Sequence, residues 1–177
     1  MPAAARPAIR VLLVAPVLFG LAGCFQSETR LIAEADAAFP FKTMTLKTED
    51  GETGILQQQG KVYVYDEPGS SSSDDDGDQT VQLYQVGDGL YIAQHSDQDG
   101  EATYIFAKKT GDTILTRADC RGLDAATLSA ANVKAPQKAT GIVYRCRADD
   151  LKSLIALARS PAIWAEHTTT LQIVSIE

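Results

Sequence analysis

The chain has 177 residues and a formal net charge of -7, with 45% hydrophobic, 7% aromatic and 22% charged residues. This length suits one domain rather than two, and the composition excludes a disordered chain. The acidic balance argues against a nucleic-acid partner, because such a partner needs a surface rich in Lys and Arg.

The N-terminus has the pattern of a secretory signal peptide. It carries Arg6 and Arg10 without any acidic residue, continues with an apolar run over 11–21, and reaches Cys24 through small residues. A basic start, a short apolar run and small residues before a cleavage site define such a signal. The run is too short for a transmembrane helix, which needs about 20 apolar residues.

Residues 1–27 resemble the N-terminus of bacterial lipoproteins, whose lipobox reads Leu-Ala-Gly-Cys, as residues 21–24 do here. The resemblance implies that residues 1–23 are removed, that the Cys24 thiol carries diacylglycerol, and that the new amino group is acylated, for instance with palmitate. Stable membrane anchoring needs more than one acyl chain, which this modification provides. Phe25 stands where inner-membrane lipoproteins of enteric bacteria often have Asp, which favours the outer membrane, facing the periplasm.

The remaining cysteines predict one disulfide. Once Cys24 is lipidated, Cys120 and Cys146 are the two thiols left in an exported and therefore oxidising location. Their spacing is not that of a Cys-x-x-Cys redox motif, and no His lies at the spacing of a zinc site. A bridge between them would stabilise the fold by roughly 3–4 kcal/mol.

The segment 24–40 is predicted to be a lipidated tether, with a helical turn near 31–38, and residues 41–177 to form one β-rich domain. Alternation of apolar and polar residues and the spacing of turn signals predict an antiparallel meander that forms a small barrel or sandwich. The expected strands are 41–48, 61–65, 81–86, 90–94, 102–108, 113–116 and 168–176.

The turn Asp88-Gly89 indicates a hairpin of type I′, because Asp-Gly tolerates the positive φ of that turn. In such a hairpin Val86 pairs with Tyr91, and Tyr84 pairs with Ala93. Tyr84 and Tyr91 would then share one face of the meander, opposite the aliphatic residues. Tyr combines large contact area with a hydroxyl group, so this face is the predicted binding face, and packing of the tyrosines across neighbouring strands is the alternative.

The C-terminal third mixes helix and strand signals. Asp124 caps a predicted helix over 124–131, and residues 141–147 read as a strand. Asp149 and Asp150 precede a second helix, whose apolar residues recur at helical spacing until Pro161 ends it. We expect this helix to pack on the sheet.

Motifs for catalysis and metal binding are weak. The acidic insert 69–78 places Asp74, Asp76 and Asp78 at alternating positions, but Gln79 and Gln85 replace the Gly and Glu of a calcium-binding loop. Such a segment is interpreted as a solvated surface loop, with a loose cation site as the alternative. The Asp97–Glu101 stretch fails the same test and reads as a hairpin turn.

The two histidines, His95 and His167, are expected at the surface, and the sequence contains no nucleophile motif such as Gly-x-Ser-x-Gly. We therefore predict no catalytic residue, no metal and no cofactor.

These observations favour a non-catalytic envelope lipoprotein, a binding or interaction module that reaches the membrane through its lipid and has a protein or glycan partner. The alternatives are a hydrolase of cell-wall or lipid material and a purely structural envelope protein. A concave tyrosine face would favour binding, whereas a cleft with a perturbed carboxylate or His would favour the enzyme.

Overall fold

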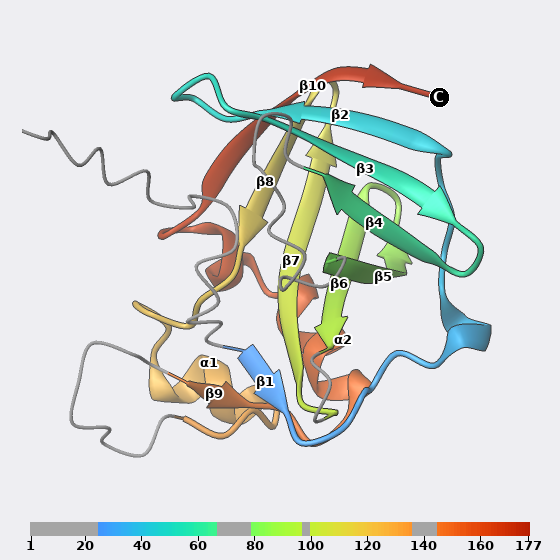
Figure 1. Cartoon of the computed structure of the whole chain (residues 1–177). Helices are drawn as coiled ribbons and strands as arrows, with labels where there is room; N and C mark the ends of the chain where they lie inside the picture. Colours follow the sequence, from blue (N-terminus) through green and yellow to red (C-terminus); the bar gives the residue numbers. More distant parts are fainter. Residues whose placement is uncertain (1–24, 67–78, 97–99, 136–144) are drawn as a thin grey trace, which may run out of the picture.

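A computed structural model describes residues 25–66, 79–96, 100–135 and 145–177 of the chain, and in these residues eight antiparallel strands form a closed barrel (Figure 1). The barrel strands are β2 (Thr43–Lys47), β3 (Thr53–Gln59), β4 (Val62–Asp66), β5 (Gln79–Gly87), β6 (Leu90–Ser96), β7 (Ala102–Thr110), β8 (Thr113–Arg117) and β10 (Thr169–Ile176). Each pairs with the next in this order, and β10 also pairs with β2, which closes the sheet. The predicted meander is confirmed, and it is a barrel rather than a sandwich.

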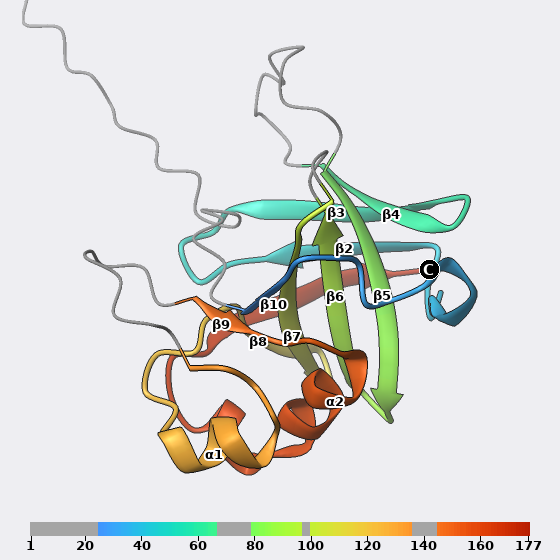
Figure 2. The same ribbon diagram turned by 90° about the horizontal axis from the view of Figure 1, so that it is seen from below.

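A second layer covers part of the outer surface of the barrel. It consists of the short strands β1 (Phe25–Ser27) and β9 (Cys146–Arg147), the helices α1 (Ala125–Ala130) and α2 (Leu151–Arg159), and the 3-10 turn η2 (Pro161–Trp164). β1 pairs with β7 on one side and with β9 on the other. Figures 1 and 2 show these elements gathered on one side of the barrel.

Alternation along the strands divides the apolar side chains into two cores. Odd-numbered residues of β5 and β6, such as Leu83 and Ala93, belong to the core inside the barrel, which also contains Met44. Even-numbered residues of β6 and β7, such as Ile92 and Phe106, belong to the core between the barrel and the outer layer. A closed barrel thus buries both faces of β6 and β7, one against the interior and one against helices.

The predicted C-terminal helix is confirmed as α2. Leu154 and Leu157 are fully buried in the outer core, as the helical spacing of the apolar residues requires. The Asp150 carboxylate caps the first turn by accepting a hydrogen bond of 2.7 Å from the Ser153 backbone N–H. The helix ends at Arg159, ahead of Pro161. The predicted α1 and its cap Asp124, which accepts from the Thr127 N–H at 2.6 Å, are also present.

The predicted disulfide is confirmed. Cys120, just after β8, is bonded to Cys146 in β9, with Cα atoms 6.3 Å apart. Both side chains are buried in the outer core. The bridge therefore ties the outer layer to the end of a barrel strand.

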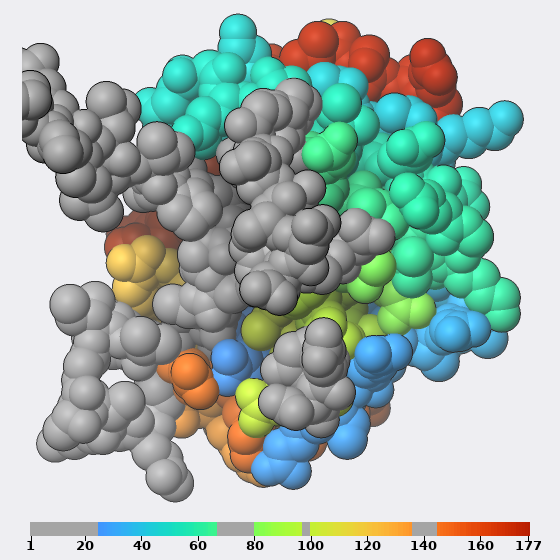
Figure 3. Space-filling model, in the orientation of Figure 1, coloured from blue at the N-terminus to red at the C-terminus, as the bar shows by residue number. Residues whose placement is uncertain are grey.

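Residues 25–40, expected to be a tether, are instead an ordered part of the domain. Phe25 is fully buried, with its ring edge-on to Phe106 at 4.9 Å, and Ile32 is 1% exposed. The predicted helical turn is reduced to a 3-10 turn, η1 (Glu34–Asp36). In Figure 3 this blue segment lies against the barrel rather than extending from it. Apolar residues of this segment pack on the outer face of β7, a strand that lies far away in the sequence. Local sequence patterns do not reveal such a contact.

Two further strand expectations were incomplete. β3 was not predicted, because its second half, Gln57–Gln59, lacks the apolar alternation that marks a strand. In the expected strand 141–147, only Cys146 and Arg147 belong to a described strand, and residues 141–144 lie outside the described residues. The acidic loop with Asp74, Asp76 and Asp78 also lies outside them.

Candidate functional site

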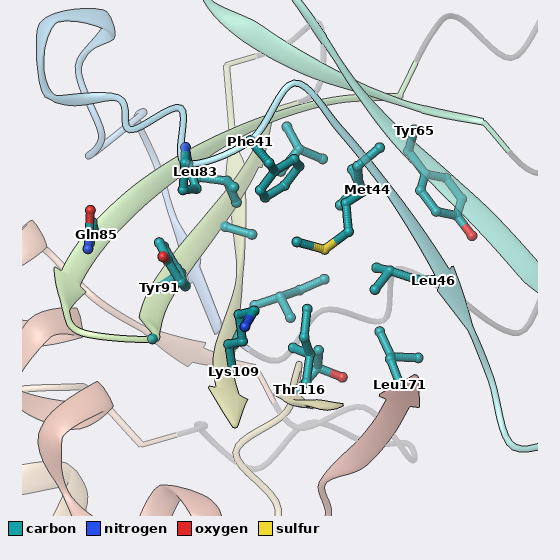
Figure 4. A pocket seen from close by; sticks show the side chains of 18 of the residues that line it. Phe41, Met44, Leu46, Tyr65, Leu83, Gln85, Tyr91, Lys109, Thr116 and Leu171 are labelled. Carbon is teal, nitrogen blue, oxygen red and sulfur yellow. The ribbon is translucent and has the colours of Figure 1, made fainter. Parts of the chain in front are cut away.

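The barrel interior contains a cavity of about 670 Å³, and all eight barrel strands contribute to its wall (Figure 4). This volume lies within the range of about 300–1,000 Å³ that is typical of small-molecule sites. Eight-stranded barrels have an interior just wide enough to be filled by side chains or to hold one small ligand. The cavity shows that side chains do not fill this interior completely.

Aliphatic side chains form most of the cavity wall. Met44 and Leu46 come from β2, Leu83 from β5, Ile114 from β8 and Leu171 from β10. Figure 4 shows Met44 and Leu83 pointing toward the centre from separate strands. The wall therefore favours an apolar occupant over a strongly hydrated one.

Small residues leave the space open. Ala93 and Ala107 face the interior from β6 and β7, the two strands that are paired at Ala93–Ile105 and Tyr91–Ala107. A methyl group fills little of the space that a larger side chain would occupy. Gly54 leaves room for a neighbouring side chain. A Cβ atom at this position would lie 2.5 Å from Cε2 of Tyr65, so the lack of a side chain at Gly54 lets the Tyr65 ring lie against β3.

An aromatic cluster lies where the chain enters β2. The Tyr63 hydroxyl donates a hydrogen bond of 2.7 Å to the Phe41 carbonyl, and the two rings are 4.6 Å apart. Phe39 adds a third ring, 5.9 Å from that of Tyr63. Burial raises the pKa of the Tyr63 phenol, so this side chain stays neutral and keeps its proton for the hydrogen bond. The cluster fixes one end of the wall.

Polar groups occupy the wall near the β5–β6 and β7–β8 turns. They are Gln85, Asp88, Tyr91 and Lys109. Lys109 is half-buried, and its ammonium group donates a hydrogen bond of 2.9 Å to the Gly111 carbonyl. In Figure 4 the side chains of Gln85, Tyr91 and Lys109 lie on one side of the cavity, with Tyr65 and Leu46 across from them.

The predicted binding face is wrong in its geometry, because Tyr84 and Tyr91 lie on opposite sides of the sheet. Tyr91 pairs with Gln85 and lines the cavity, whereas Tyr84 pairs with Ile92 and packs on the outer core. The predicted register fails at a β-bulge between Gln85 and Gly87, which adds one residue to β5. One extra residue moves every later side chain to the other face.

The turn itself explains the bulge. A type I′ turn needs positive φ at both central residues, but of Asp88 and Gly89 only Gly89 has it, at 65°. The Asp-Gly hairpin is therefore present, with a different turn type. Gly89 is required there for a second reason, since a Cβ atom would lie 2.7 Å from the Lys109 carbonyl oxygen.

The histidines differ in position. His95, expected at the surface, is half-buried in the cavity wall, with Nδ1 3.1 Å from the Thr80 carbonyl oxygen. His167 is exposed, as expected, and lies 4.0 Å from the Glu166 carboxylate. The sequence did not predict an interior position for His95, because polar residues occupy both faces of its strand. Gln94 lies outside the barrel and His95 lies inside it.

In the ranges that the structure describes, no three His, Cys, Asp or Glu side chains come together as metal ligands would. Nor is any helix among those residues both long and apolar enough to cross a membrane. Comparison with protein-family models, curated proteins and solved structures finds no match for this chain. The functional proposal therefore depends on the cavity.

Proposed function

We propose that this chain is a lipid-anchored, non-catalytic binding protein of the bacterial cell envelope, and that its barrel holds one small apolar ligand. The cavity of about 670 Å³ is the observation that carries the proposal. The anchor is supported by the lipobox at residues 21–24. Together they support the proposal that the domain holds its ligand next to a bilayer.

An occupant would also relieve an energetic penalty. Apolar side chains around an empty space lack the dispersion contacts that a packed interior supplies, so large-to-small changes in protein cores destabilise the fold. A purely structural envelope protein would gain stability from larger side chains at Ala93 and Ala107. Their small size instead favours a ligand that completes the packing.

Filling the cavity tests the proposal. The full chain carrying Cys24→Ser keeps the whole folded domain and lacks the lipidation site, so no acyl chain of its own competes for the cavity. We expect an apolar fluorescent dye such as N-phenyl-1-naphthylamine to bind it with increased emission. Ala107→Phe, which places a ring inside the barrel, should weaken dye binding about tenfold or more, because the ring and the dye compete for the same volume.

The matched control is Gln57→Phe, which adds the same ring at an exposed position of β3 and should leave dye binding unchanged. Circular dichroism would verify that both variants are folded. A parent chain that does not bind the dye would refute the proposal, as would a folded Ala107→Phe variant that binds it as tightly as the parent.

A further inference from the structure

Two neighbouring lysines of β7 lie in different surroundings. Lys109 faces the barrel interior, and it is the one Lys or Arg among the described residues of the cavity wall. Lys108 faces outward, with its ammonium group 6.0 Å from the centre of the Trp164 ring. Alternation along a strand accounts for the difference. One cation of an acidic chain is thereby placed at the edge of an apolar cavity.

The ammonium group of Lys109 has donor capacity to spare. An ammonium group has three N–H donors, and within the described residues Lys109 uses one, toward the Gly111 carbonyl. No described carboxylate, Asp88 included, forms an ion pair with it. A half-buried cation without an anionic partner is a favourable place for an anion from a ligand.

The neighbours of Lys109 add neutral hydrogen-bonding groups. Gln85 and Tyr91 are paired across β5 and β6, and Tyr91 is paired with Ala107 of β7, two residues from Lys109. Figure 4 shows the three side chains on the same side of the cavity. Beyond them the wall is aliphatic, with Leu83, Ile114 and Met44. The site therefore has a polar, cationic side and an apolar body.

The geometry points to an amphiphile with one apolar body and an anionic head group, a long-chain carboxylate, as the ligand. The head group would accept hydrogen bonds from Lys109, with Gln85 and Tyr91 beside it, and the apolar body would fill the space among the aliphatic residues. This inference rests on the proposed function, because it names the chemistry of the ligand for the same cavity.

A pair of probes separates charge from apolar binding. A dansyl-labelled long-chain carboxylic acid and its methyl ester have the same apolar body, and the acid is ionised at neutral pH. With the full Cys24→Ser chain, we expect the acid to bind about tenfold more tightly than the ester. Lys109→Gln should remove that difference by weakening acid binding alone, and Lys109→Arg should retain most of it, because the charge remains.

Lys108→Gln is the matched control, since it removes the same charge from the adjacent, outward-facing position, and it should leave the binding of both probes unchanged. If acid and ester bind equally well and Lys109→Gln changes neither, the anionic head group is refuted while the apolar cavity stands. If neither probe binds the parent chain, the proposed function itself fails.

Discussion

At the scale of single residues, Gln94 shows how a buried polar side chain organises this fold. It is 1% exposed on the outer face of β6. Its Oε1 accepts hydrogen bonds from the backbone N–H groups of Leu31 and Ile32, at 2.9 and 2.8 Å. Its Nε2 donates to the Ile32 carbonyl and to Gln82 Oε1. The Gln94 amide thus supplies hydrogen-bond partners to the backbone of Leu31 and Ile32, two residues that belong to no strand.

Replacing Gln94 with Leu tests this role. The substitution introduces an apolar side chain of similar size and leaves the Ile32 N–H group without its acceptor, whereas the Leu31 N–H group keeps the Tyr104 hydroxyl at 3.1 Å. A buried donor without a partner costs about 1–3 kcal/mol, so the free energy of unfolding should fall by at least that amount. Urea denaturation measures it.

Gln57→Leu on β3 is the comparison, because Gln57 is exposed and surface changes usually stay within about 0.5 kcal/mol. Equal denaturation midpoints for Gln94→Leu and the parent would show that the amide does not hold the segment.

Arg117 is a second buried polar side chain with an organising role, 1% exposed at the end of β8. Its guanidinium donates to the backbone carbonyls of Asp119, Arg121, Ile163 and Glu166. A buried charge is tolerated when such acceptors replace its hydration. The contacts join the loop after β8 to η2 and so hold the start of β10 in position.

At the scale of elements, helix α2 depends on its N-cap. The Asp150 carboxylate accepts hydrogen bonds from the Ser153 N–H at 2.7 Å and from the Ser153 hydroxyl at 2.8 Å. The backbone hydrogen bond is the main cause that lowers the pKa of Asp150 below its usual value. The cap is therefore strongest when the carboxylate is ionised.

We expect Asp150→Ala to lower the free energy of unfolding by about 1 kcal/mol at neutral pH. Because the folded-state pKa is below the unfolded-state value of about 3.9, the contribution is complete above that value and is lost as the pH falls through the folded-state pKa. The stability difference between parent and variant should shrink in acid. Urea titrations of both proteins across the acid range measure it, and a difference that is the same at every pH would contradict the role of the ionised cap.

At the scale of the whole molecule, the ordered N-terminal segment constrains the proposed lipid anchor. Phe25, the residue that follows Cys24 in the sequence, is fully buried in β1. A lipid on Cys24 would hold the β1–β9 side of the domain at the bilayer surface. The barrel and its proposed ligand would then remain close to the membrane.

We predict that the mature protein begins at Cys24 and carries diacylglycerol on its thiol and an acyl chain on its amino group. Intact-mass measurement of the membrane-extracted protein tests this, and Cys24→Ser should leave the protein unprocessed or release it from membranes. A mature N-terminus at another residue, or an unmodified soluble form of the parent, would overturn the prediction.

Much of the fold follows from local patterns. Alternation and turn residues predict most of the barrel strands, and the capping aspartates with Pro161 predict α2, because these signals act over a few residues. The pairing of Cys120 with Cys146 follows from cysteine arithmetic in a chain that is predicted to be exported. β3 was missed since Gln57–Gln59 resembles a polar loop, and its pairing with β2 and β4 decides its conformation.

By itself the sequence determined the strand-rich composition, the helix and the disulfide, whereas the tertiary structure decided everything about the cavity. Closure of β10 on β2 joins distant parts of the chain, and no local pattern specifies it. The bulge at Val86 places Tyr91 inside and Tyr84 outside. Lys108 and Lys109 are indistinguishable as neighbours in the sequence, yet only one faces the interior. In a closed barrel, the side of the sheet that a residue occupies depends on register and closure, which long-range pairing establishes.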